Sequence, residues 1–275
     1  MHFLSDLWLR IGSFNDGFAH ETWQDRRVNS GIEMRMKSRA RAFVSVLGAA
    51  ALFGAVTLGA EATAIVAVII GIILAVGWPF LIELPNPGTS RRVIIATSAA
   101  AGLVAYFLSV RELVFLAGFT VIAAFVAEMA RRDGRPRLLE QISGTVSGSM
   151  LALMPALWVR TVVVGGAGTA AARAVLTAVA VALLLDLLIP YSLRHLRHLV
   201  YMAGGFIGGL GFMLVSDIEW HYAAIAGLVA GTILAMFDSI LRRLPPATKR
   251  RPGVALAMVP LCVAAVVAYT LALFL

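Results

Sequence analysis

The sequence predicts an all-α, polytopic transmembrane helical bundle of about nine spans, with the N-terminus inside and the C-terminus outside. Three observations predict this fold class: the composition, the length of the apolar runs and the charge of the stretches between them. Hydrophobic residues make up 60% of the 275 residues and charged residues only 14%, whereas ordinary soluble domains have about 45–50% and about 25%. A helix needs about 20 mostly apolar residues to cross a bilayer, and the chain contains a series of such runs.

The apolar runs define a transmembrane domain over residues 43–275, in which the connecting stretches are short. The predicted spans are 43–60, 63–82, 92–110, 113–130, 142–164, 170–190, 199–215, 222–241 and 254–275. Because no large segment separates them, any chemistry must use the spans or their ends.

Residues 1–42 form a predicted cytoplasmic N-terminal segment. Its apolar residues between Phe3 and Phe14 recur at helical spacing, with Asp6 and Arg10 between them. This pattern is typical of an amphipathic helix lying on the membrane surface, and a tail without regular structure is the alternative. A signal peptide is not predicted, because charged residues interrupt every apolar run in the segment.

The basic residues predict the orientation. If the N-terminus is inside, 20 of the 23 Lys and Arg face the cytoplasm, and only Arg111, Arg160 and Arg173 lie outside. Such a bias in short loops is the positive-inside rule. It also accounts for the net charge of +8, so nucleic acid is not an expected partner. Because 21 of the 23 are Arg, in a chain rich in Ala and Gly, we expect a bacterial protein of the plasma (inner) membrane.

Small residues predict how the helices pack. Glycines four apart let two helix backbones approach closely, which matters where lipid removes the usual hydrophobic drive for association. These glycines are Gly144, Gly148, Gly204, Gly205, Gly208, Gly209, Gly211, Gly227 and Gly231. They predict close helix–helix seams, and a cavity or a closely approached ligand is the alternative. Pro155 interrupts the span at 142–164 and predicts a kink there.

Four spans that run inward each carry an acid near the inner end, followed by a basic loop with Pro or Gly and a return helix. The acids are Glu83, Glu128, Asp186 and Asp238. The arrangement predicts a degenerate repeat of helical hairpins, as is common in transporters. The alternative is that the four helix ends at the membrane boundary resemble one another independently, without a repeat.

Local spacing separates the four acids into two pairs. Glu128 has arginines three and four residues on, and Asp238 has Arg242 at four, which are ordinary same-face ion pairs. For Glu83 and Asp186 the position four residues on is a proline. These two are therefore the candidates for a role in transport or proton movement.

Asp186 is the stronger candidate, because it lies within a run of leucines. A carboxylate inside a membrane is costly and usually faces a partner or a wet cavity. The alternative is a structural pair with Arg194, His195 or an arginine of another loop.

Two polar groups lie at the predicted rims. Asp217, Glu219 and His221 form a cluster on the outer face that could bind a divalent metal or supply a general base, although outer loops often carry acids. On the inner face, basic residues predict contact with anionic lipid headgroups. They are Arg194, His195, Arg197 and His198.

The leading functional hypothesis is a permease-like transporter of a small solute or a lipid-linked precursor. A membrane-embedded transferase acting on an envelope lipid and a non-catalytic scaffold subunit are the alternatives. The sequence lacks a His-Glu-x-x-His zinc helix and the acid-rich motifs of lipid phosphotransferases, so an enzyme is the less favoured class. No cofactor is predicted, and the expected partners are the lipid bilayer, a second copy of the chain or a subunit of a membrane complex.

Overall fold

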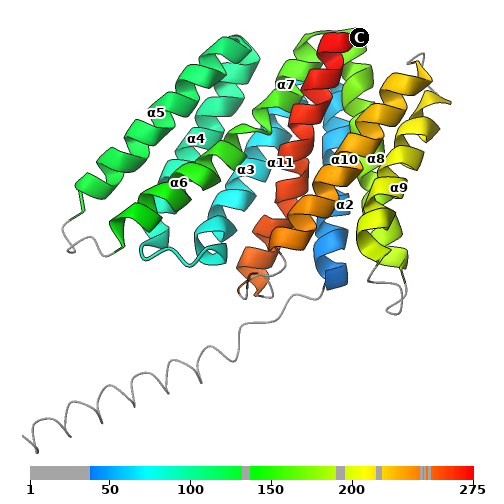
Figure 1. Ribbon diagram of the computed structural model, residues 1–275. Coiled ribbons are helices and arrows are strands. Elements are labelled where there is room, and N and C mark those ends of the chain that lie inside the picture. Colours follow the sequence, from blue (N-terminus) through cyan, green and yellow to red (C-terminus); the bar gives the residue numbers. More distant parts are fainter. Residues whose placement is uncertain are drawn as a thin grey trace, which may run out of the picture. The chain divides into compact units, whose positions relative to one another are not determined.

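The computed structural model describes residues 38–131, 137–189, 196–214, 219–241, 244, 246 and 249–275. These residues form α-helices joined by short connections, and no β-strand occurs among them (Figure 1). The predicted all-α class is confirmed. The chain divides into two compact units, Met1–Arg35 and Met36–Leu275, and all described residues belong to the second. The amphipathic helix predicted near the N-terminus lies outside the described residues.

Each predicted span overlaps one helix, except that the span at 142–164 is divided between two. The helices are α2 (Ser38–Leu58), α3 (Ala60–Leu81), α4 (Pro87–Phe107), α5 (Val110–Met129), α6 (Leu138–Leu153), α7 (Ala156–Val163), α8 (Gly166–Leu188), α9 (Arg197–Met213), α10 (Trp220–Leu241) and α11 (Arg250–Phe274).

Within the described residues, seven helical stretches are long and apolar enough to cross a membrane, as in a multi-pass membrane protein. They comprise α2, α3, α5, α8, α10, α11 and the continuous pair α6–α7. The other two predicted spans, α4 and α9, fall outside this group. Charged Arg91 and Arg92 and polar Thr97 and Ser98 make α4 less apolar. With 17 residues, α9 is only about 26 Å long.

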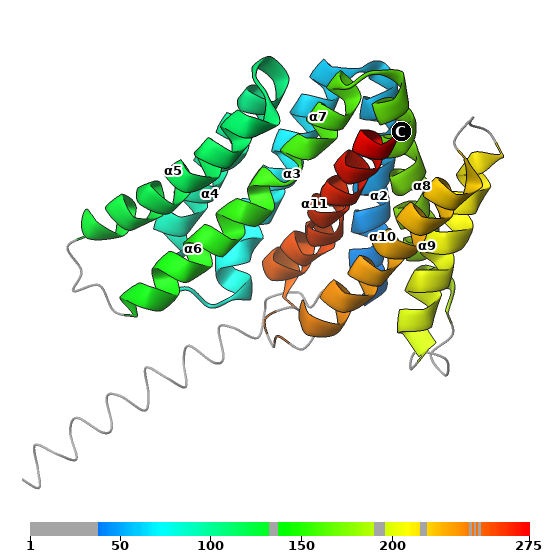
Figure 2. The same cartoon turned by 45° about the horizontal axis from the view of Figure 1, so that its top comes forward.

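The second unit is arranged around α11, which packs against α2, α3 and α8. In both views α4, α5 and α6 lie on one side of it, and α8, α9 and α10 lie on the other (Figures 1 and 2). The outermost helix, α5, is the least buried of the apolar stretches. It exposes large side chains such as Phe115, Phe119 and Phe125. An exposed apolar surface of this kind is suited to contact with lipid.

Glycines bring α9 and α10 into backbone contact. A methyl group added at Gly205 would overlap the carbonyl oxygen of Gly227, and one at Gly209 would overlap that of Ala223. On α10, Gly231 meets the carbonyl of Tyr201 in the same way. The predicted close seam between these two helices is confirmed.

The predicted kink at Pro155 is also confirmed, because α6 ends at Leu153 and Pro155 is the N-cap of α7. One turn later the indole of Trp158 is fully buried. Its Nε1 donates a hydrogen bond of 2.9 Å to the carbonyl of Leu261. The second half of this span is therefore tied to the central helix α11.

The first half of the span is tied to α4 by a buried amide. Oε1 of Gln141 accepts a hydrogen bond of 2.9 Å from the backbone N–H of Asn86, and its Nε2 donates to the Asn86 carbonyl at 2.8 Å. The same Nε2 lies 2.6 Å from Oγ of Ser90, which is in turn 2.6 Å from Oγ1 of Thr145. These bonds satisfy backbone groups at the start of α4 that have no partner within the helix.

Replacing Gln141 with Leu is expected to destabilise the protein by about 1–3 kcal/mol, because the half-buried backbone groups of Asn86 lose their bonds to the amide. Unfolding of the purified protein in mild detergent, followed by circular dichroism, measures the loss. The control is Ser147→Ala on the exposed face of the same helix, with an expected change below about 0.5 kcal/mol. Equal midpoints for the two variants would contradict the role given to the amide.

Candidate functional site

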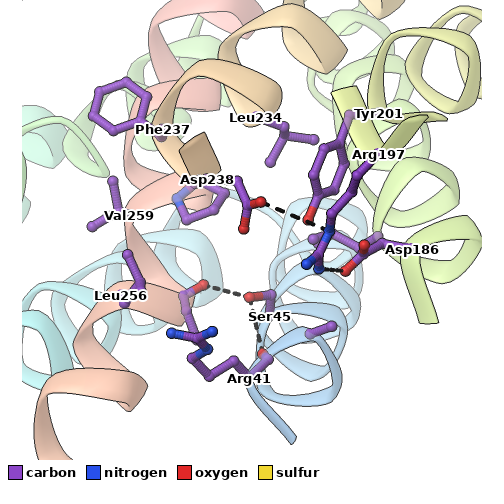
Figure 3. Close-up of a pocket in the computed structure, with 14 residues that line it drawn as sticks. Arg41, Ser45, Asp186, Arg197, Tyr201, Leu234, Phe237, Asp238, Leu256 and Val259 are labelled. Carbon is purple, nitrogen blue, oxygen red and sulfur yellow. Dashed lines mark hydrogen bonds and ion pairs between the residues drawn. The ribbon is translucent and has the colours of Figure 1, made fainter. Parts of the chain in front are cut away.

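Charged side chains from four helices meet inside the second unit, at one end of the helices (Figure 3). Asp186 lies two residues before the end of α8, and Arg197 is the first residue of α9. Asp238 lies near the end of α10, and Arg41 lies in the first turn of α2. Because α8, α9 and α10 pack side by side, these helix ends bring their polar residues to the same depth.

Arg197 lies between the two acids. Its Nη2 donates to Oδ2 of Asp186. Its Nε lies 3.7 Å from Oδ2 of Asp238, which is too far for a hydrogen bond. The guanidinium carbon lies 5.5 Å from the ring centroid of Tyr201, one turn along α9. The exposed fractions are 9% for the Arg197 side chain, 4% for Asp186 and 19% for Asp238, so the group is largely removed from solvent.

A cavity of about 40 Å³ lies beside these charges. Its lining includes both acids and both arginines, together with Ser45 of α2 and Pro260 of α11. A space of this size holds water only where polar groups surround it, and here they do. The four charged side chains sum to zero, which limits the cost of placing them away from water.

On the α11 side the cavity is bounded by an interrupted stretch of helix. Pro260 has no N–H, so it cannot donate the bond that the Leu256 carbonyl would otherwise receive. The next carbonyl, that of Ala257, accepts a hydrogen bond of 2.7 Å from Oγ of Ser45. Irregular backbone at membrane depth is tolerated where it lines a polar cavity. Thus α11 contributes polar backbone to the site.

The predicted candidate Asp186 belongs to this site, and its partner is Arg197. Arg197 was not among the predicted partners: it lies in the same connection as Arg194 and His195, which are outside the described residues, and not in another loop. Sequence analysis assigned Arg197 to a headgroup-binding patch, yet its side chain points inward to Asp186. His198, the next residue, is exposed and remains suited to lipid headgroups.

The other candidate acid, Glu83, does not join this site. It is exposed, in the turn between α3 and α4, and its backbone is left-handed with φ of 52°. Since α3 ends at Leu81, the carboxylate is outside the helix that was expected to carry it. The structure therefore separates the two acids that sequence analysis grouped together.

The outer polar cluster is described only in part. Nε2 of His221 lies 3.3 Å from Oε2 of Glu219, and both side chains are well exposed. Asp217 lies outside the described residues. Among the residues that the structure describes, no group of three or more His, Cys, Asp or Glu is arranged to hold a metal ion.

Glu128 has the partner that its spacing predicted. Its carboxylate pairs with Arg131 three residues on, and both side chains are buried. This ion pair joins neighbouring turns at the end of one helix. It differs from the Arg197 group, which joins separate helices around a cavity.

Sequence analysis missed Asp238 and Arg41 as members of the site. Asp238 was matched with Arg242, which lies outside the described residues, because only same-helix spacing was considered. The glycines of α9 and α10 could have predicted that Arg197 and Asp238 face each other. On α9, steps of four residues lead back from Gly205 to Tyr201 and Arg197, so this face points toward α10. On α10, Asp238 follows Gly231 by two turns.

Comparison of the chain with protein-family models, with curated proteins and with solved structures finds no match in any of the three. A function must therefore be inferred from the residues of the site themselves.

Proposed function

We propose that the protein is a permease-like transporter of a bacterial inner membrane that moves a small solute. Asp186, Asp238 and Arg197 form its inner gate, and the two carboxylates carry protons. The observation that supports this proposal is the buried, charge-balanced group that lines a cavity between packed helices. Ionisable residues within membrane helices commonly mark ion pathways and proton relays.

A purely structural ion pair needs two charges, as Glu128 and Arg131 illustrate. The site has four, with the shared Arg197 placed between two acids on different helices. Moving the Arg197 side chain from Asp186 to Asp238 would change how α9 contacts α8 and α10. Protonation of either carboxylate would favour one arrangement, which is the behaviour that a proton-coupled gate requires. The small cavity supports a small solute over a lipid-linked precursor.

The proposal includes nine crossings with the N-terminus inside. In Figures 1 and 2, α4 and α9 run alongside the apolar helices that flank them. Counting these two with the seven apolar stretches gives nine. The distribution of Lys and Arg supports the orientation. In that orientation the Arg197 site lies near the cytoplasmic face.

The orientation is tested with single cysteines in a Cys262→Ser background, since Cys262 is the only cysteine and is buried. A membrane-impermeant maleimide is expected to label Arg111→Cys in intact cells. It should label Arg91→Cys only after permeabilisation, because the two exposed positions lie at opposite ends of α4 and its loop. The reverse pattern would invert the topology, and labelling of both in intact cells would rule out the proposed crossing of α4.

Transport is tested in proteoliposomes with an entrapped pH dye. Halides, small monocarboxylates, amino acids and sugars are added singly as probes. At least one is expected to change the internal pH faster with the protein than in protein-free liposomes. Asp186→Asn and Asp238→Asn should each lower that rate at least tenfold, because the neutral amide cannot carry a proton.

The matched control is Glu140→Gln, which removes an exposed carboxylate paired with Arg137 and should retain the wild-type rate. No solute-dependent change with the wild-type protein would count against transport. Wild-type rates in both Asn variants would remove the two carboxylates from the mechanism.

A further inference from the structure

A buried hydrogen-bond donor of Arg197 has no acceptor within reach. Its Nε is shielded from solvent and makes no hydrogen bond with any described residue. Nη2 of the same side chain is engaged by Asp186, and Asp238 stays 3.7 Å from Nε. A buried charged donor that makes an ion pair but no hydrogen bond is costly in a low-dielectric interior, so such a group calls for an explanation. A ligand that accepts a hydrogen bond from Nε supplies one.

The buried donor favours an anion as that ligand, since an anion accepts hydrogen bonds. Arg197 and Arg41 line the same cavity from α9 and α2 (Figure 3). A metal cation in the cavity would be attracted by the two aspartates but repelled by both guanidinium groups, and it could not accept a hydrogen bond from Nε. A small anion would be attracted by both guanidinium groups, and it would complete the hydrogen bonding of Nε.

Charge balance then requires a proton. The two arginines and two aspartates sum to zero, so a monovalent anion would leave one uncompensated negative charge in a membrane interior. A proton taken from solution by a carboxylate oxygen restores neutrality. Asp238 is the suitable acceptor because its side chain is 19% exposed, against 4% for Asp186, so a proton from solution reaches it more readily. Once protonated, Asp238 attracts Nε less strongly, and the anion takes its place.

We infer that the Arg197 site binds a small monovalent anion together with one proton, the anion held by Arg197 and Arg41 and the proton by Asp238. This inference rests on the proposed function and specifies its substrate class. Among the described residues, the other titratable groups that act on Asp238 are Asp186 on α8, Arg197, His198 and Tyr201 on α9 and Arg41 on α2, while the α11 residues lining the cavity contribute backbone and apolar side chains. The cavity of about 40 Å³ limits the ligand to roughly the size of one or two water molecules, such as a halide or formate.

The test is equilibrium binding of ³⁶Cl-chloride and ¹⁴C-formate to the purified full-length protein in detergent, at pH 5.5 and pH 7.5. At least one anion is expected to bind saturably, and at least tenfold more tightly at the lower pH. Asp238→Asn mimics the protonated acid, so its binding should be tight at both pH values. Arg197→Gln should weaken binding at least tenfold, whereas Arg137→Gln, at an exposed ion pair, should not change it.

Three results would overturn the inference: no saturable binding of either anion, saturable binding of ²²Na-sodium in its place, or an unchanged pH dependence in Asp238→Asn. Should Arg197→Gln fail to fold, Asp238→Asn alone decides the matter. Anion binding without flux in proteoliposomes would reject transport and retain the site. Flux of a different solute without anion binding would reject the anion and retain transport.

Discussion

Replacing Gly205 with Leu is expected to prevent the folded protein from accumulating. Even a methyl group at this position would overlap the Gly227 carbonyl oxygen and crowd the backbone of Gly231. Adding a methylene to a well-packed core costs about 1–3 kcal/mol where side chains can adjust. Here the neighbours are backbone atoms of α10, which cannot adjust without moving the helix. Two helices held by close contact in lipid lose that association when their backbones are forced apart.

The face of α9 that packs against α8 cannot move to make room, because a Cβ at Gly208 would already overlap the Cα of Ala178. The measurement is the monodisperse fraction after detergent extraction, followed by size-exclusion chromatography of a fluorescently tagged protein. The control is Gly211→Leu on the same helix, where an added Cβ meets open space and near wild-type recovery is expected. Equal recovery of the two variants would contradict the seam.

Replacing Arg197 with Met is expected to cost about 3–5 kcal/mol, which is the usual cost of removing one partner from a buried ion pair. The variant leaves Asp186 and Asp238, two largely buried carboxylates, without the cation between them. Thermal unfolding of the purified protein in mild detergent measures the loss. This loss should exceed the loss caused by Gln141→Leu. Arg197→Met leaves buried charges without a partner, whereas Gln141→Leu leaves only neutral hydrogen-bonding groups without one.

A second substitution separates lost charge pairing from lost packing. The double variant Asp186→Leu/Arg197→Met removes both members of the closest pair, and it should recover at least about half of the lost stability. Arg137→Met, at an exposed pair with Glu140, should change stability by less than about 0.5 kcal/mol. If the double variant is no more stable than Arg197→Met, the unpaired Asp186 carboxylate does not account for the lost stability.

The helices themselves could be predicted from the sequence, because bilayer thickness sets the length of apolar run that a span requires. The α9–α10 seam was predictable for a similar reason, since glycines four apart line one face of a helix. Both properties belong to residues that are neighbours along the chain. The break at Pro155 follows equally from local chemistry.

The Arg197 site could be predicted only in part. Asp186 stood out because it lies in a leucine run, but its partner depended on which helices pack together. Asp238 was assigned to a neighbour four residues on, because the same-helix rule cannot describe contacts between helices. Glu83 illustrates a second limit. A shift of two residues in the end of α3 decides whether this acid lies in the span or in an exposed turn.

The division of one span into α6 and α7 has a consequence for how substitutions combine. Both halves pack against α3 and α4, but only the first has substantial contact with α5 and only the second with α8. Gln141 in the first half bonds to Asn86 at the start of α4, whereas Trp158 in the second half bonds to Leu261 of α11. Changes around Gln141 and changes around Trp158 should add independently in their effect on stability, as they do for distant sites.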